Sequence, residues 1–239
     1  MATSAPAQPV DIEKWPAAEI IRWAAGRFPK VAMSCSFQSQ SLPLLHIVSR
    51  VAPELPVIFL DTGYHFPETL AFRDRLVKEW GLNLRVVRAA MPREEFLHKH
   101  GPDLYARDPN LCCYLNKVEP MQRAMEGLDA WISGIRRDQS PERASAAVVE
   151  VTPQGVHRVH PMASWTGRDV WKYIHDHDLP DHPLLRQGYL SIGCAPCTRP
   201  VALGEGEREG RWSGQGKGEC GLHTILRGAE ASSIPSRSA

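Results

Sequence analysis

Val31-Ala-Met33 and Val57-Ile-Phe-Leu60 are two short apolar runs, and residues 41–51 between them have the pattern of a helix. Apolar runs of this length are typical of strands buried on both faces of a sheet. A strand, a helix and a second strand in this order indicate a βαβ unit, in which the two strands run parallel. The fold is therefore expected to start from a parallel sheet.

The same alternation continues toward the carboxyl end of the chain. Pro67 and Glu68 suit the first turn of a helix, because proline lacks only a donor that is unused there and an acid complements the helix dipole. Thr166 with Asp169 has the pattern of a capping box ahead of another helix. The other expected elements are a helix over 67–80, strands over 82–87 and 130–133, a helix over 110–126, and a hairpin of 148–151 with 156–159. Together they predict a doubly wound α/β fold with a mostly parallel sheet.

Charge and hydropathy exclude several classes of protein. Lysine and arginine number 28 against 27 acids, a net charge of +1, so the chain lacks the basic field of nonspecific nucleic-acid binding. It has no apolar run of about 18 residues, and its first residues lack the charged start and apolar stretch of a secretory signal. We therefore expect no nucleic-acid partner, no membrane segment and a cytoplasmic location, where thiols stay reduced.

Composition also divides the chain. Residues 1–12 and 228–239 are polar and rich in alanine, proline or serine, and we expect both ends to be disordered. Residues 13–200 are expected to form the α/β domain. From Thr198 to His223, glycines and alternating Glu and Arg replace apolar periodicity, so we expect residues 201–227 to form a mobile C-terminal arm or lid.

The six cysteines are unevenly placed. Cys112-Cys113 and Cys194-Ala-Pro-Cys197 are two pairs, Cys220 stands alone near the carboxyl end, and Cys35 is expected to pack as a small buried residue. Two thiolate pairs from distant segments can close a four-sulfur site, which for soft ligands means zinc or an iron-sulfur cluster. Cys220 is then left as a candidate nucleophile.

Two loops follow the first two strands, at the edge where open parallel sheets bind ligands. The first contains Ser34, Ser36 and Gln38 and offers backbone N–H groups and a helix amino end to phosphate or sulfate, although it is not a Walker loop. The second begins with Asp61, which suits an adenosine amine or a ribose hydroxyl. Ordinary turns with no ligand are the alternatives at both places.

Basic residues gather near the cysteine segments. Arg136, Arg137 and Arg143 follow the strand at 130–133, and Lys117 lies four residues after Cys113. Guanidinium forks match oxyanions bidentately, and an ammonium adds a point charge. A solvated charged surface is the alternative, but the convergence with the cysteines favours an anion site.

Four segments carry a resemblance to a known family. They are Cys112-Cys113-x3-Lys117-Val-Glu-Pro120, Gly134-Ile-Arg-Arg-Asp-Gln-Ser-Pro141, Gly188-Tyr-x2-Ile192-Gly-Cys194-Ala-Pro-Cys197-Thr-Arg-Pro200 and Glu219-Cys220-Gly-Leu-His223. From about residue 30 to 223 the chain resembles the assimilatory adenylyl-sulfate (APS) reductases, the iron-sulfur branch of the sulfonucleotide (PAPS/APS) reductases. The resemblance implies a fold like that of the adenine nucleotide α-hydrolases.

The resemblance also implies a chemistry. Cys220 would attack the sulfur of adenosine 5'-phosphosulfate, displace AMP and form an S-sulfocysteine that reduced thioredoxin cleaves to sulfite, as in sulfate assimilation and cysteine biosynthesis. His223 would lie beside this nucleophile. The residues implied around the phosphosulfate are Lys117, Arg143, Arg208 and Arg211, and the ligands implied for a 4Fe-4S cluster are Cys112, Cys113, Cys194 and Cys197. The resemblance is also compatible with a homo-oligomer.

The chain departs from this family in two places. Where many cluster-bearing members have a Phe-Gly-Ala-Glu-Asp type of turn, this chain has Phe37-Gln-Ser-Gln-Ser41. Where many members have several tryptophans, Trp212 is followed by Ser-Gly-Gln-Gly. We therefore expect different nucleotide contacts at the first turn and a more flexible lid.

Three other functions stay open on the sequence. The enzyme could reduce 3'-phosphoadenosine 5'-phosphosulfate, or both nucleotides, although the four extra cysteines argue against this. An ATP pyrophosphatase-like adenylating or sulfur-transfer enzyme would need a Ser-Gly-Gly-x-Asp-Ser loop, which is absent. A noncatalytic four-cysteine redox sensor or interaction module is the third, and vicinal cysteines are unusual for its structural zinc.

Overall fold

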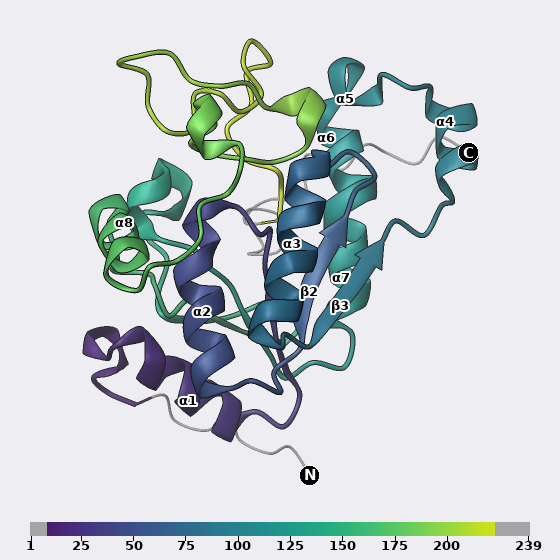
Figure 1. The fold of residues 1–239 in the computed structure, drawn as a ribbon. Coiled ribbons are helices and arrows are strands. Elements are labelled where there is room, and N and C mark those ends of the chain that lie inside the picture. Colours follow the sequence, from purple (N-terminus) through teal and green to yellow (C-terminus); the bar gives the residue numbers. More distant parts are fainter. Residues whose placement is uncertain (1–8, 223–239) are drawn as a thin grey trace.

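A six-stranded sheet forms the centre of the computed structural model, which describes residues 9–222 (Figure 1). Its strands lie in the order β3-β2-β1-β4-β6-β5, and all neighbouring pairs are parallel except the antiparallel hairpin of β5 and β6. The strands are β1 (Val31–Ser34), β2 (Val57–Asp61), β3 (Leu84–Arg88), β4 (Ala130–Ile132), β5 (Val149–Val151) and β6 (His157–Val159). The predicted mostly parallel sheet is confirmed.

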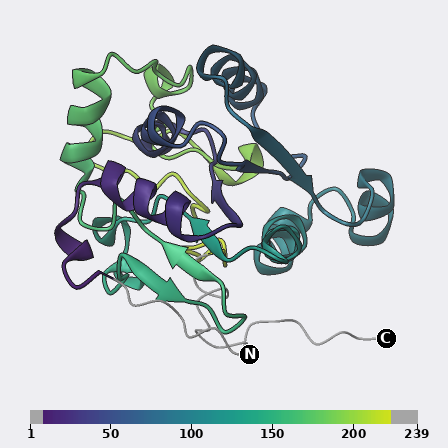
Figure 2. The ribbon, with the colours of Figure 1, turned by 90° about the horizontal axis from the view of Figure 1, so that it is seen from below.

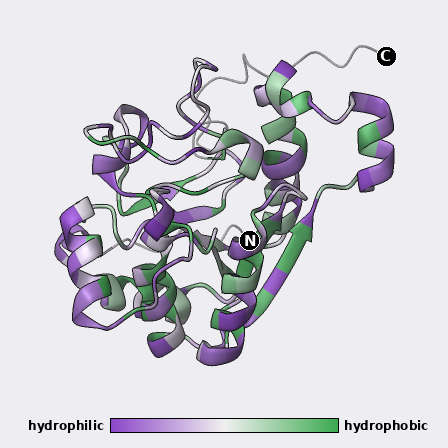
Figure 3. Ribbon diagram, turned by 45° about the horizontal axis from the view of Figure 1, so that its top comes forward, coloured by the Kyte–Doolittle hydropathy of each residue, from purple (hydrophilic) through white to green (hydrophobic). Residues whose placement is uncertain are grey.

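Helices cover both faces of this sheet (Figure 2). On one face α1 (Ala17–Arg27), α2 (Leu42–Val51), α3 (Pro67–Trp80) and α8 (Gly167–Asp176) supply the larger apolar cluster, and on the other α7 (Glu119–Met125) supplies a smaller one. Successive strand residues point to opposite faces, so Met33 joins the first cluster and Ala32 the second. The central strands are therefore apolar except for their last residues, Ser34 in β1 and Asp61 in β2, as expected for strands covered on both faces. Hydrophobic and hydrophilic residues alternate along the covering helices (Figure 3).

The N-terminal segment departs from the prediction. Residues up to 12 were expected to be disordered, yet a 3-10 turn spans Ile12–Lys14 and the Ile12 side chain is buried in the main core. A single isoleucine in a proline- and alanine-rich stretch forms no hydrophobic periodicity. The burial of Ile12 therefore could not be predicted from the local sequence. Residues 1–8, and the predicted tail at 228–239, lie outside the described residues.

The predicted helix over 110–126 is present but interrupted. It consists of α6 (Pro109–Cys113), a π-helical turn (Tyr114–Val118) and α7. Pro120 has no N–H for the usual helical bond four residues back, and a π turn ahead of it relieves that mismatch. The Asp108 side chain caps the start by accepting the Leu111 N–H at 2.9 Å. The turn therefore sets the place of Lys117 directly after the vicinal cysteines.

Short helices and turns make up the rest of the described chain. Two helices that the sequence analysis did not anticipate, α4 (Arg93–His100) and α5 (Leu104–Arg107), project beside α6 (Figure 1), and Phe96 and Leu104 pack there with Cys112. Short 3-10 turns span Ser39–Ser41, Arg137–Gln139, Pro141–Arg143, Leu185–Gln187 and Ala195–Cys197. Within residues 9–222, no helix has the length and apolar character needed to cross a membrane.

Candidate active site

A cavity of about 190 Å³ opens where β1, β2 and β4 end. Its lining brings together predicted site residues from four separate segments of the chain. They are Ser34, Ser36, Gln38, Lys117, Arg143, Arg208, Arg211 and Cys220. The carboxyl ends of the parallel strands thus meet the C-terminal arm at one place, as the topology of an open sheet predicts.

Asp61, a predicted site residue, is not among the described residues that line this cavity. The Asp61 carboxylate accepts the Gly63 N–H at 3.1 Å and forms an ion pair with Arg88 at 2.9 Å, so its oxygens are committed to the end of β2 and to β3. His223 lies outside the described residues.

The serine-rich turn after β1 is fixed by side-chain contacts. The Trp131 indole N–H donates to Ser34 Oγ at 2.8 Å, and the Ile192 N–H donates to Gln38 Oε1 at 2.9 Å. Ser36 is exposed at the cavity. Gln38 therefore ties the first turn to the loop that leads into Cys194.

The two cysteine pairs meet at a second, smaller cavity next to the first. Cys112, Cys113, Cys194 and Cys197 all line it together with Lys117, and all four cysteines are buried. Thr62 Oγ1 lies 3.4 Å from Cys194 Sγ. No group of three or more His, Cys, Asp or Glu side chains within residues 9–222 forms a site for a metal ion.

Burial and mutual repulsion hold most of these thiols in the protonated form. Burial raises the pKa of Cys112 to about 12 and that of Cys197 to about 11, and the neighbouring cysteines act in the same direction on both. Burial also acts to raise the pKa of Cys194, but Lys117 and the Thr62 hydroxyl outweigh it, so the Cys194 pKa falls below its usual value. A positively charged soft group is what would offset repulsion among four thiolates.

Lys117 lines both cavities. Burial acts to lower its pKa, but the attraction of negative charge on Cys194, Cys113 and Cys220 outweighs that effect and raises the Lys117 pKa above its ordinary value. It is therefore a cation at neutral pH, between the cysteine pairs and Cys220.

Arg211 packs closely against the loop before Cys194. Its guanidinium lies over the Trp212 ring, 4.4 Å from the centroid, and a Cβ placed on Gly193 would come within 2.2 Å of its Nη2. Its Nε is buried and has no hydrogen-bond partner within residues 9–222. This arginine has donor capacity left for a ligand in the cavity.

Arg143 and Arg208 are already paired with a carboxylate. Glu219 accepts two hydrogen bonds from Arg143, both at 2.9 Å, and lies 3.3 Å from Arg208 Nη2. Burial lowers the pKa of Arg208, although Glu219 acts in the opposite direction. Glu219 directly precedes Cys220, so these two arginines act on the segment that carries the candidate nucleophile.

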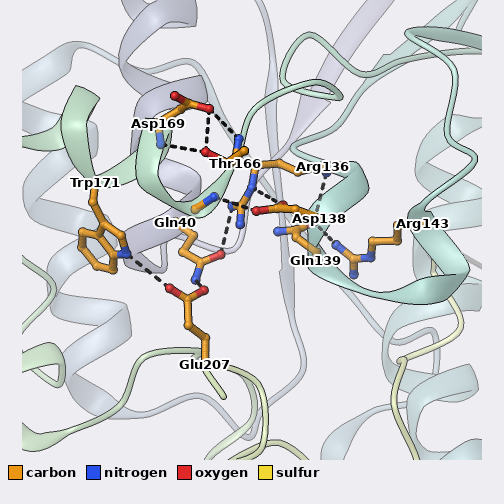
Figure 4. Close-up of polar contacts among 10 residues, drawn as sticks. Gln40, Arg136, Asp138, Gln139, Arg143, Thr166, Asp169, Trp171 and Glu207 are labelled. Atoms are coloured by element: carbon orange, nitrogen blue, oxygen red, sulfur yellow. Dashed lines mark hydrogen bonds and ion pairs between the residues drawn. The ribbon is translucent and has the colours of Figure 1, made fainter. Parts of the chain in front are cut away.

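The arm has a separate attachment at Glu207 (Figure 4). Glu207 accepts hydrogen bonds from Gln40 Nε2 and, at 3.3 Å, from the Trp171 indole. The buried Arg136 donates to Gln40 at 3.0 Å and pairs with Asp138 at 2.9 Å. Residues after β1, after β4 and in the arm are thereby joined by one polar network.

Some residues of this site were not predicted from the sequence. Glu219 belongs to the motif around Cys220 but had no predicted role, and neither did Gly193, Thr62 or His65. Burial lowers the pKa of His65, which lines the larger cavity, and its Nε2 lies 2.9 Å from the Leu60 carbonyl oxygen. His65 follows Asp61 by four residues, and a cluster of polar residues after a buried strand was the signal that could have found it.

Comparison with known proteins identifies the family of this chain. A family model described as the phosphoadenosine phosphosulfate reductase domain matches residues 30–200. The chain belongs to this family. It is 46% identical over 218 residues to an adenosine 5'-phosphosulfate reductase of Chelativorans sp. (strain BNC1), covering 89% of this chain and 86% of the relative. It is 42% identical over 214 residues to the protein of the same name from Streptomyces coelicolor, covering 89% and 90%. The resemblance noted on the sequence motifs is confirmed.

Solved structures within and beyond the family share the architecture. The phosphoadenylyl-sulfate reductase of Candida auris, solved as a phosphate complex, superposes with a TM-score of 0.70 at 29% identity over 81% of this chain and 98% of that one. The Candida glabrata FMN adenylyltransferase matches with a TM-score of 0.57 at 15% identity over 82% of this chain and 67% of that one, which shows the fold alone. The expected α/β fold is therefore confirmed.

Proposed function

We propose that this enzyme reduces adenosine 5'-phosphosulfate to sulfite and AMP in sulfate assimilation for cysteine biosynthesis, with reduced thioredoxin as the electron donor. The observation that carries the proposal is that Cys220 lines the same cavity as Lys117, Arg208 and Arg211. A thiol nucleophile and cations for a dianionic group are then present in one place. Relatives named adenosine 5'-phosphosulfate reductase at 40–46% identity support this substrate.

The proposed reaction has two steps. The Cys220 thiolate attacks the sulfur of the substrate, an S–S bond forms, the bond from sulfur to the phosphate oxygen breaks, and AMP leaves with the electron pair. A thioredoxin thiolate then attacks Cys220 Sγ and releases sulfite, and its second thiol resolves the mixed disulfide. Cys220 returns to the thiolate, thioredoxin is oxidised, and the sulfur of the substrate is reduced by two electrons.

The cations act on the charge that develops in the first step. Negative charge builds up on the phosphate oxygen as the bond to sulfur breaks, and preorganised cations in a partly enclosed cavity stabilise such charge strongly. Arg211 Nε is buried and has no partner within residues 9–222, and Lys117, whose pKa is raised, is charged. We assign the phosphosulfate chiefly to these two side chains and the nucleotide to the cavity wall at Ser34, Ser36 and Gln38.

The arm is proposed to move during turnover. Trp212 is buried, and its backbone N–H donates to the Cys197 carbonyl at 3.0 Å, so the arm lies against the loop of Cys194 and Cys197 in this structure. Thioredoxin must reach Cys220, which is only partly exposed here. Opening of residues 201–227 between the two steps would provide that access.

We also propose that the four buried cysteines hold a 4Fe-4S cluster. The donor set fits, because four soft sulfur ligands from two segments line one small cavity beside a cation. When bound, the cluster would shape the electric field near Lys117 and would not supply electrons for turnover. None of the six cysteines, which all lie within the described residues, forms a disulfide, as is usual in a reducing compartment such as the cytoplasm.

Two cysteine variants test this function. Cys220→Ser is expected to keep the brown iron-sulfur chromophore and to lose sulfite release, whereas Cys194→Ser is expected to lose both. Sulfite and AMP are measured with and without thioredoxin, with adenosine 5'-phosphosulfate and with its 3'-phosphorylated form as the alternative substrate. Sulfite release by Cys220→Ser would contradict the nucleophile assignment, and faster turnover of the 3'-phosphorylated nucleotide would contradict the substrate assignment.

A further inference from the structure

The Glu219 carboxylate is a buried charge for which the proposed reaction has no use. Its side chain is only 7% exposed, although it lines the cavity beside Cys220. Four contacts surround it: two hydrogen bonds from Arg143 at 2.9 Å, Arg208 Nη2 at 3.3 Å and the Ser140 hydroxyl at 3.3 Å. These contacts hold the Glu219 carboxylate in one position. Loss of either arginine would leave a buried charge uncompensated, so leaving this position is costly.

Arg143 has little left to offer a substrate. Its Nε and Nη2 bind the two oxygens of Glu219, its Nη1 donates to Gln139 Oε1, and its side chain is 8% exposed. The edge of the guanidinium that would grip an oxyanion bidentately is therefore committed to Glu219.

Arg208 holds the same segment at a second point. Its Nη2 donates to the Gly218 carbonyl at 3.0 Å in addition to its contact with Glu219. Residues of the loop at 140–143 and of the start of the arm thus bind Gly218 and Glu219, the two residues that precede Cys220.

We propose that Glu219 is a positioning residue that fixes Cys220 against the cavity, and that Arg143 acts through Glu219 and does not bind the substrate. The inference rests on the proposed function, because it assumes that Cys220 is the nucleophile. A thiolate must approach the sulfur of the substrate in line with the leaving oxygen, so the backbone that carries it has to be held. Arg211 and Lys117 are not among the residues that contact Glu219, so both cations stay available to a ligand in the cavity.

The decisive measurement is the single-turnover rate at which Cys220 becomes S-sulfocysteine, followed by intact-protein mass spectrometry without thioredoxin. Glu219→Gln is expected to slow this rate about 100-fold, the usual effect of misplacing a reacting group by about 1 Å. Arg143→Gln should have a similar effect, and the double variant should be no slower than either single one, because both remove the same anchor. Glu219→Asp, which keeps the charge, should recover part of the rate and tests the proposal if Glu219→Gln fails to fold.

Substrate affinity separates positioning from binding. In a Cys220→Ser background, where the nucleotide is not consumed, the Kd for adenosine 5'-phosphosulfate should be unchanged by Glu219→Gln and by Arg143→Gln. Glu205→Gln is the matched control, because Glu205 is a carboxylate of the same arm that pairs with Arg199 at 2.7 Å and does not line the cavity. It should keep the wild-type rate.

Different failures have different meanings. A wild-type rate in Glu219→Gln, or a weaker Kd in Arg143→Gln with an unchanged Kd in Glu219→Gln, would overturn the anchor while leaving the proposed function in place. Failure of the wild-type enzyme to form any adduct at Cys220 would refute the proposed function and the anchor together.

Discussion

Replacing Gly193 with alanine is expected to displace Arg211 in the larger cavity, and so to lower activity, without unfolding the protein. A Cβ on Gly193 would lie 2.2 Å from Nη2, 2.3 Å from Cζ and 2.7 Å from Nη1 of Arg211. Ordinary van der Waals contact begins at 3.4 Å, so the guanidinium has to retreat by about 1.2 Å (3.4 − 2.2). The displaced atoms are the far end of a flexible side chain, which the fold can accommodate. Arg211 would then no longer lie where we place the phosphosulfate.

The expected loss is about 100-fold in kcat/KM for adenosine 5'-phosphosulfate, the effect of a displacement of about 1 Å in a positioned group. That factor corresponds to about 2.7 kcal/mol of transition-state stabilisation. Sulfite release with thioredoxin gives the rate, and thermal unfolding tests whether stability is kept. Gly26→Ala is the matched control, because Gly26 lies in α1 and a Cβ added there would have no atom within 4 Å. The control should be fully active and slightly more stable, by up to about 1 kcal/mol.

Two results would refute this reasoning. A wild-type kcat/KM in Gly193→Ala would show that the placement of the Arg211 guanidinium does not matter for turnover. Unfolding of Gly193→Ala would show that the Arg211 side chain cannot move away from residue 193. The contact between Gly193 and Arg211 would then be structural, and any loss of activity would be secondary.

Two further predictions concern stability. Burial lowers the pKa of His182 from 6.5 to about 4, and its Nδ1 accepts the Leu184 N–H at 3.2 Å, so protonation favours the unfolded chain. The free energy of unfolding should therefore fall as pH drops from 6.5 to about 4, by up to about 3 kcal/mol, and urea titrations of His182→Gln should show a flatter slope in that window. Thr166→Ala removes the hydroxyl that accepts the Asp169 N–H and should cost about 1 kcal/mol in the same assay, with Thr166→Ser near wild type; an unchanged Thr166→Ala would contradict the cap assignment.

The sheet was predictable from residues 31–60 because burial on both faces leaves a continuous apolar run in each strand. The convergence of the cysteine pairs with Lys117 was likewise predictable from their motifs, and the cavity linings confirm that these residues lie together. Asp61 shows what such prediction leaves out. A carboxylate at the end of β2 suits a nucleotide, but its partner Arg88 ends the neighbouring strand, and only the parallel register of β2 with β3 brings the two together.

The arm was the part that sequence could not resolve, for a physical reason. Its path depends on single long-range contacts such as Glu219 with Arg143 and Glu207 with Gln40, which leave no periodic pattern in the chain. Gly193 is similar, because its lack of a side chain makes room for Arg211, a residue that follows it by 18 positions (211 − 193). Such contacts become visible only when both segments are placed.

Lys117 lines both cavities, so its positive charge acts on the residues of each. The Lys117 ammonium acts to lower the pKa of Cys194 and of Cys113, while negative charge on Cys220 acts to raise the pKa of Lys117. Because these effects are reciprocal, a change in charge among the four buried cysteines would alter the electrostatic interaction of each with Lys117. We therefore propose that a group bound by those cysteines acts on the reaction through Lys117 without exchanging electrons with the substrate. The π turn that follows Cys113 is what makes this possible, since it holds the lysine within reach of both sites.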